Sequence, residues 1–281
     1  MQVIFSCENT EYMWWQAELL HYTYTKIGMR SHLTALVSQT DEPPREFTCS
    51  TFPTANYKNR LGAEVYVPLN KPGSIAEWAS SVDCDSDTVL IVDPDSVFIR
   101  PVEHPAIVRS GEAYADAYDY MDPNLPGNKT VLLRHCAQRF HARVQPVGIY
   151  ILISVADLRE LAPRWLEKAI DIKSDTVCVK TLRYEGWISE MLAYTIAAAE
   201  LGIHHHLVNF SQTTGSDCLD YPITHYCYPL LDEFRRTLWS KWDYHPWDHP
   251  PVSSAATSEG RELLLNLAQL AEARRELAGA Q

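Results

Sequence analysis

The chain has 281 residues, enough for one large α/β domain or two small ones. Hydrophobic residues make up 46% of it, so a sizeable core can be buried. The formal net charge of −12 argues against nucleic acids and anionic membrane surfaces as partners, because both attract basic proteins.

Apolar runs and helical periodicity predict alternating strands and helices along the chain. The predicted strands are residues 2–6, 33–37, 64–67, 88–92, 97–100, 147–154 and 203–209. The predicted helices are residues 12–26, 74–81, 155–170 and 185–201. Residues 40–59, rich in Pro, Thr and Asn, predict a loop, as does the acidic stretch 83–87. This alternation predicts an α/β fold over residues 1–230, with a single mixed, mostly parallel sheet flanked by helices.

Residues 231–281 predict an aromatic-rich loop followed by an amphipathic helical extension, which begins near residue 257. Leu264, Leu267 and Leu270 form its apolar stripe. This helix suits docking either on the core or on a second subunit of a homodimer, and core docking is the simpler interpretation. The aromatic stretch before it suits either a packing seam under the helix or a platform for an acceptor. Its members are Trp239, Trp242, Tyr244 and Trp247.

Neither a basic, then apolar leader nor a run of 18 apolar residues occurs, so we expect no signal peptide and no transmembrane helix. The seven cysteines are scattered and odd in number, and none forms a CxxC pair. This pattern favours a reduced, cytoplasmic protein over a disulfide framework.

Asp93 and Asp95 directly follow the continuous apolar run of residues 88–92. Ligands of open α/β sheets bind outside the carboxyl ends of the strands. Two carboxylates in that position suit Mg²⁺ or Mn²⁺, which would bridge the phosphates of a nucleotide diphosphate. The alternative interpretation is a solvated turn that closes the strand.

Of three further features, His225 and Glu190 leave two interpretations each. His225 suits a third ligand for Mn²⁺ or a packed, hydrogen-bonded histidine among aromatic residues. Glu190 lies in a largely apolar predicted helix, so its carboxylate is either paired inside the protein or faces a cleft. The run 204–206 consists of three histidines, and we interpret it as strand or edge surface rather than as a site.

Several segments follow one another in a family-specific order. They are Trp15-Gln16 with His21-Tyr22, Leu69-Asn70-Lys71-Pro72 with Trp78, Val92-Asp93-Pro94-Asp95 with Pro101, Pro146-Val147-Gly148, Gly186-Trp187 through Glu190-Met191 and Tyr194, Leu201-Gly202-Ile203-His204, Gln212 with Asp217, and His225-Tyr226-Cys227-Tyr228. Together, over about residues 3–228, they resemble motifs of the hydroxyproline O-arabinosyltransferases and the related peptidyl-serine α-galactosyltransferases.

The resemblance implies a GT-A glycosyltransferase fold, a UDP-sugar donor and a Mn²⁺ or Mg²⁺ ion held by Asp93, Asp95 and His225. It also implies transfer with retention to a hydroxyl of a peptide or small natural product. Lys71 would stabilise the departing diphosphate, and Glu190 would orient the acceptor or stabilise the cationic sugar. The donor-binding candidates are Ser6, Asn9, Tyr12, Gln16, Asn70, Asp93 and Gln212.

Four departures from the family pattern concern the expected sugar and acceptor region. Ser96 replaces a histidine, Lys71 an arginine and Ile149 an asparagine, and residues 212–217 differ from the family's QPPWD. They leave open whether the sugar is arabinofuranose, galactose or similar, and they suggest a bacterial-type soluble relative. The rival functions are a nucleotidyltransferase or phosphohydrolase that uses the same carboxylates, and a non-catalytic carbohydrate-binding protein.

Overall fold

A central seven-stranded sheet organises the chain in this computed structural model, which describes residues 1–62, 64–84, 86–103, 107–215, 219–248, 250 and 256–279. The strand order is β3-β2-β1-β4-β7-β6-β8. The strands are β1 (Gln2–Glu8), β2 (Leu33–Ser38), β3 (Ser50–Thr54), β4 (Thr88–Val92), β6 (Glu112–Ala117), β7 (Val147–Ser154) and β8 (His204–Val208). Within this sheet only β7 runs antiparallel to its neighbours, so the predicted mixed, mostly parallel sheet is confirmed.

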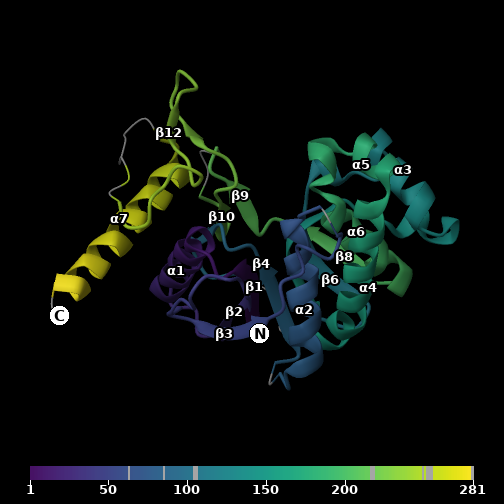
Figure 1. Cartoon of the computed structure of the whole chain (residues 1–281), viewed down its shortest axis with the longest axis horizontal. Coiled ribbons are helices and arrows are strands. Elements are labelled where there is room, and N and C mark those ends of the chain that lie inside the picture. Colours follow the sequence, from purple (N-terminus) through teal and green to yellow (C-terminus); the bar gives the residue numbers. More distant parts are fainter. Residues whose placement is uncertain are drawn as a thin grey trace.

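Helices cover both faces of this sheet (Figure 1). The helices α2 (Asn70–Ser81), α4 (Val155–Ser174) and α6 (Ser189–Leu201) pack side by side, and α1 (Glu11–Lys26) lies on the other side. Thr10 and Ser154 begin α1 and α4, because each hydroxyl accepts a hydrogen bond from a first-turn amide. Two shorter helices are α3 (Pro126–His135) and α5 (Thr176–Thr181), and the 3₁₀ turns are Val67–Leu69, Asp119–Met121, Gln138–Arg143 and Arg183–Gly186.

Three predicted boundaries are wrong. The predicted strand at 64–67 is replaced by a 3₁₀ turn, since Pro68 has no N–H to give to a ladder. The predicted loop 40–59 contains β3, whose Pro53 is tolerated because β3 is an edge strand. The helix predicted from residue 185 begins at Ser189, after the left-handed residues Tyr184 and Glu185.

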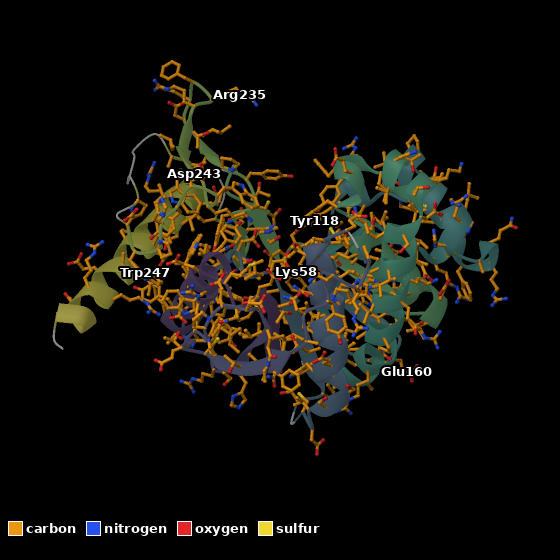
Figure 2. The ribbon with its side chains drawn as sticks, viewed as in Figure 1. Lys58, Tyr118, Glu160, Arg235, Asp243 and Trp247 are labelled. Carbon is orange, nitrogen blue, oxygen red and sulfur yellow. The ribbon has the colours of Figure 1, made fainter. Side chains whose placement is uncertain are left out.

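A smaller sheet and the C-terminal segment extend this core. The small sheet joins β5 (Ser96–Phe98), β10 (Ile223–His225) and β9 (Ser211–Thr213). The hairpin β11 (Leu230–Leu231) and β12 (Thr237–Trp239) follows, and Arg235 marks its projecting end in Figure 2. Helix α7 (Ser258–Gly279) completes the chain.

Helix α7 packs on α1, which is the simpler of the two predicted arrangements. Leu264 and Leu267 are buried in a second apolar cluster with Trp15 of α1. Arg274 pairs with the buried carboxylate of Glu18, which also anchors the helix to α1. The C-terminal segment is therefore packed against the sheet domain by apolar and ionic contacts together.

The described residues also bear on the membrane and cysteine predictions. None of their helices is both long and apolar enough to cross a membrane. The six cysteines within the described ranges are free thiols. The seventh, Cys218, lies outside those ranges, and so does Asp217, one of the residues that carried the family resemblance.

Candidate active site

The carboxyl end of β4 places two aspartates beside a histidine from a distant part of the chain. All five residues of β4 are buried, and the chain then runs through Asp93 and Asp95 into β5. Strand β10 pairs antiparallel with β5, so that His225 lies opposite Ser96. The His225 Nε2 atom is 3.2 Å from Asp95 Oδ2. One ligand atom from each of Asp93, Asp95 and His225 lies within 4.8 Å of the others, as the sequence predicts.

Two cationic groups contact Asp95. Lys241 Nζ lies 2.5 Å from Asp95 Oδ2, and His225 contacts the same oxygen. Burial alone would raise the pKa of Asp95, but His225 and Lys241 outweigh it and hold that pKa well below its usual value. Burial would likewise lower the pKa of His225, and the Asp95 carboxylate raises it instead. Asp95 is therefore an ionised, charge-compensated carboxylate and not a solvated turn residue.

Lys71 joins the other aspartate to Glu190. Its Nζ lies 2.9 Å from Asp93 Oδ1 and 3.2 Å from Glu190 Oε1. Burial opposes the charge of Lys71, but Asp93 and then Glu190 hold its pKa above its usual value. Burial raises the pKa of Glu190 despite the attraction of Lys71. Glu190 thus matches both predicted interpretations, since it is paired inside the protein and stands beside the candidate metal ligands.

The backbone around Glu190 is fixed by two aromatic side chains. Its N–H donates to the Tyr66 hydroxyl at 3.1 Å, and its carbonyl accepts from Trp165 Nε1 at 2.7 Å. Its Oε2 is buried and has no hydrogen-bond partner among the described residues, and Glu190 lines a small cavity together with Lys71, Gly148 and Trp165. A buried carboxylate oxygen in that state is costly, so it is a natural contact for a bound ligand.

The predicted donor-binding residues near β1 are mostly engaged in holding the framework. The Ser6 hydroxyl accepts from Ser74, and the Asn70 amide donates to Glu8. The Asn9 amide donates to the carbonyls of Glu42 and Pro43, which fixes that loop across the end of β1. These three side chains shape the edge of the candidate donor site and have few hydrogen-bonding positions left.

Tyr12 and Gln16 of α1 lie closer to the charged centre. The Tyr12 hydroxyl is buried and has no hydrogen-bond partner in the part of the chain that the structure describes, and burial together with the nearby Asp95 raises its pKa. Its ring stacks on Trp242 with centroids 5.5 Å apart, while Gln16 Nε2 donates to the Tyr12 carbonyl at 2.6 Å. On β9, Gln212 is buried, and its Oε1 accepts no hydrogen bond from the described residues. The open hydrogen-bonding positions are thus on Tyr12 and Gln212.

The aromatic stretch begins at the end of β12, and its members differ in which of the two predicted uses they fit. Trp239 and Tyr244 contact the buried Trp15, and Trp247 contacts Trp14, beside α7 in Figure 2. These three form a packing seam. Trp242 is different, because it is largely exposed, lies against Tyr12 and is contacted by the ammonium group of Lys241.

Two site residues escaped the sequence analysis. Lys241 gave no signal, because a single lysine between tryptophans has no recognisable spacing. Asp116, at the end of β6, is buried and accepts hydrogen bonds from the Phe210 N–H and the Ser211 hydroxyl. It therefore holds the start of β9, the strand that pairs with β10 and His225.

A divalent cation fits the donor set at the end of β4. Two carboxylates and one imidazole are ordinary ligands for Mn²⁺, and the carboxylates suit Mg²⁺. Another such cluster among the described residues is His135, Asp175 and Cys178. There Asp175 is already bound by Arg134 and caps α5, which accounts for it structurally.

Solved structures with a similar fold include the galactosyltransferase LgtC. An active-site mutant of LgtC aligns with a TM-score of 0.54 at 12% identity, over 96% of this chain and 95% of that one. The galactosyltransferase LgtC bound to donor and acceptor sugar analogues gives 0.50 at 11% identity, over 97% and 96%. Such low identity shows the fold alone, and that fold is GT-A, as predicted.

Sequence comparison defines the family. Residues 1–207 match the hydroxyproline O-arabinosyltransferase family N-terminal domain, and the chain belongs to this family. The peptidyl serine alpha-galactosyltransferase of Arabidopsis thaliana is 29% identical over 220 residues, 74% of this chain and 27% of that protein. The hydroxyproline O-arabinosyltransferase NOD3 of Pisum sativum is 24% identical over 218 residues, 73% and 61%. The chain thus spans less than two thirds of the length of each of these two relatives.

Proposed function

We propose that this chain is a metal-dependent glycosyltransferase that moves a sugar from a UDP-sugar to a hydroxyl of a peptide. The observation that supports this most is the meeting of Asp93, Asp95 and His225 at the carboxyl end of β4 in a member of this family. The relatives are named for transfer to peptidyl serine and hydroxyproline, which favours a peptide over a small natural product as acceptor. The sugar is arabinofuranose, galactose or a similar one.

One group of site residues would bind the metal ion and the diphosphate of the donor. Asp93, Asp95 and His225 would hold Mn²⁺ or Mg²⁺, which neutralises charge on the departing diphosphate. Without a bound nucleotide, Lys71 balances the charge of Asp93, and Lys241 balances the charge of Asp95. With a nucleotide bound, their ammonium groups would contact phosphate oxygens instead, because phosphates are the stronger local anions.

Glu190 would face the reacting sugar. Its Oε2, buried without a hydrogen-bond partner among the described residues, suits a carboxylate that orients the acceptor hydroxyl or stabilises a cationic sugar during retention. Tyr12 and Gln16 would bind the uridine, with Trp242 stacked beside them. Gln212 would contact the donor from β9, and Ser6, Asn9 and Asn70 would shape its edge.

Binding and transfer assays test this function. Calorimetry with UDP should show tight binding in Mn²⁺ and weak binding after chelation, and a panel of UDP-sugars should identify the donor by thermal stabilisation. Transfer to serine- and hydroxyproline-containing peptides should be lost in Asp95→Asn, which is nearly isosteric. The exposed Asp171→Asn on α4 is the matched control and should keep full activity.

Two outcomes would contradict the proposal. Equal UDP affinity with and without metal would exclude the metal bridge. Release of free phosphate or pyrophosphate without glycosyl transfer would indicate a phosphohydrolase or nucleotidyltransferase that uses the same carboxylates.

A further inference from the structure

Three large aromatic side chains face solvent beside the candidate active site. The exposed fraction is 62% for Tyr184, 56% for Trp187 and 55% for Tyr228. By contrast, Trp78 and Trp165 are almost fully buried. Exposed aromatic rings that gather at one place mark binding surfaces more often than scattered ones do. We call these three residues the aromatic rim.

Trp187 is fixed relative to Glu190 by one buried hydroxyl. The Tyr66 hydroxyl donates to the Trp187 carbonyl at 2.5 Å and accepts from the Glu190 N–H. The Tyr66 ring also meets the Trp187 ring edge-on, with centroids 6.2 Å apart. The position of the exposed indole is therefore coupled to that of the carboxylate three residues later.

Tyr228 approaches from the other side of the site, three residues after His225. Burial, followed by Cys227 and then Tyr184, with which it shares a hydrogen bond, raises the pKa of Tyr228. Tyr120 contacts the segment of Glu190, because its hydroxyl donates to Met191 Sδ at 3.9 Å. The aromatic rim thus joins the segment that carries His225 to the segment that carries Glu190.

The backbone under the aromatic rim is strained. Tyr184, Glu185 and Gly186 have φ values of 55°, 51° and 76°, and left-handed conformations cost free energy at the two non-glycine residues. Lys173 holds this turn, because its Nζ donates to the Glu185 carbonyl at 3.0 Å and pairs with Glu64 at 2.8 Å. Backbone strain that the surroundings maintain is concentrated at functional sites.

We propose that the aromatic rim binds the polypeptide acceptor and presents its hydroxyl to the site that contains Glu190 and Asp93. This inference rests on the proposed function. A hollow lined by Lys173, Lys180, Glu64 and Glu185 continues from the strained turn. Rings suit apolar and pyrrolidine faces, and charges of both signs suit peptide groups and polar side chains.

Acceptor kinetics separate this role from a structural one. In Trp187→Ala and Tyr228→Ala we expect the KM for the peptide found in the panel to rise about tenfold each. The KM for the UDP-sugar and its slow hydrolysis without acceptor should stay within about twofold of wild type. Trp187→Phe and Tyr228→Phe should recover most of the peptide affinity. The matched control is Phe234→Ala on the β11–β12 hairpin, whose side chain is 70% exposed, and it should change nothing.

Tyr184→Gly should change thermal stability and peptide affinity in opposite directions. Relief of the left-handed strain should raise the melting temperature, while the loss of one ring should weaken peptide binding. Calorimetry of the peptide with the protein loaded with UDP and Mn²⁺ measures the peptide affinity directly.

The outcomes separate the two proposals. Absence of UDP-sugar binding in wild type would refute the proposed function itself. Transfer to the peptide with an unchanged peptide KM in both alanine variants would overturn the acceptor surface alone.

Discussion

Lys71→Met should destabilise the metal-free protein strongly, because it leaves two carboxylates without their shared cation. The Lys71 side chain is 17% exposed, and those of Asp93 and Glu190 are 17% and 6% exposed. At an effective dielectric constant of about 20, each ion pair carries roughly 5 kcal/mol of gross attraction. Lysine desolvation offsets most of that gain, and loss of one partner from such a buried pair typically costs ~3–5 kcal/mol.

Glu190 limits this loss by taking up a proton. Its pKa is already raised by burial, and removal of Lys71 raises it further. The folded variant then binds a proton that the unfolded chain releases near pH 4, so its stability falls as pH rises. The destabilisation relative to wild type should therefore be larger at pH 8 than at pH 6.

Urea unfolding in a chelator, followed by circular dichroism, measures these differences. The double variant Lys71→Met/Glu190→Gln should regain part of the stability, because one uncompensated charge is removed. Arg236→Met is the control, since the Arg236 side chain is 75% exposed in its pair with Asp232 and should cost less than ~1 kcal/mol. Equal stability of wild type and Lys71→Met at both pH values would refute the buried network.

Three other predictions concern His225, Asp116 and Leu267. His225→Ala should weaken Mn²⁺ binding in calorimetry by roughly tenfold or more, and excess Mn²⁺ should restore part of the transfer activity. A lower melting temperature that added Mn²⁺ does not change would mean that His225 only packs. Burial raises the pKa of Asp116 to about 7, so the folded state keeps a proton that the unfolded chain loses near pH 4. Its contribution to stability should fall by roughly 2–3 kcal/mol between pH 5 and pH 8, and Asp116→Asn should flatten that part of the urea-unfolding profile, whereas parallel profiles would contradict the assignment. Leu267→Ala, at a fully buried position of α7, should lower the free energy of unfolding by ~2–5 kcal/mol, and a loss below ~1 kcal/mol would show that the helix is only loosely docked.

The sequence alone predicted the parts of this protein that depend on local pattern. The buried run of β4, the aspartates that follow it and the leucine stripe of α7 are each encoded by neighbouring residues. The prediction that His225 lies beside these aspartates came from the family resemblance, which rests on the order of motifs along the chain. Strand β3 escaped prediction because its Ser, Thr and Pro residues lack apolar alternation, and its pairing with β2 alone makes it a strand.

Tertiary structure decided which charges meet in the site. Lys241 lies 146 positions from Asp95 in the chain, and Lys71 lies 119 positions from Glu190. No periodicity connects residues so far apart, because their contact depends on how β5 pairs with β10 and how α2 packs beside α4 and α6. The left-handed turn at Tyr184 and Glu185 likewise reads as helix in the sequence, since neither residue requires that conformation. Local sequence pattern thus determined most of the elements and placed the two aspartates after β4, while long-range packing alone determined the pairing of each carboxylate and the exposure of the aromatic rim.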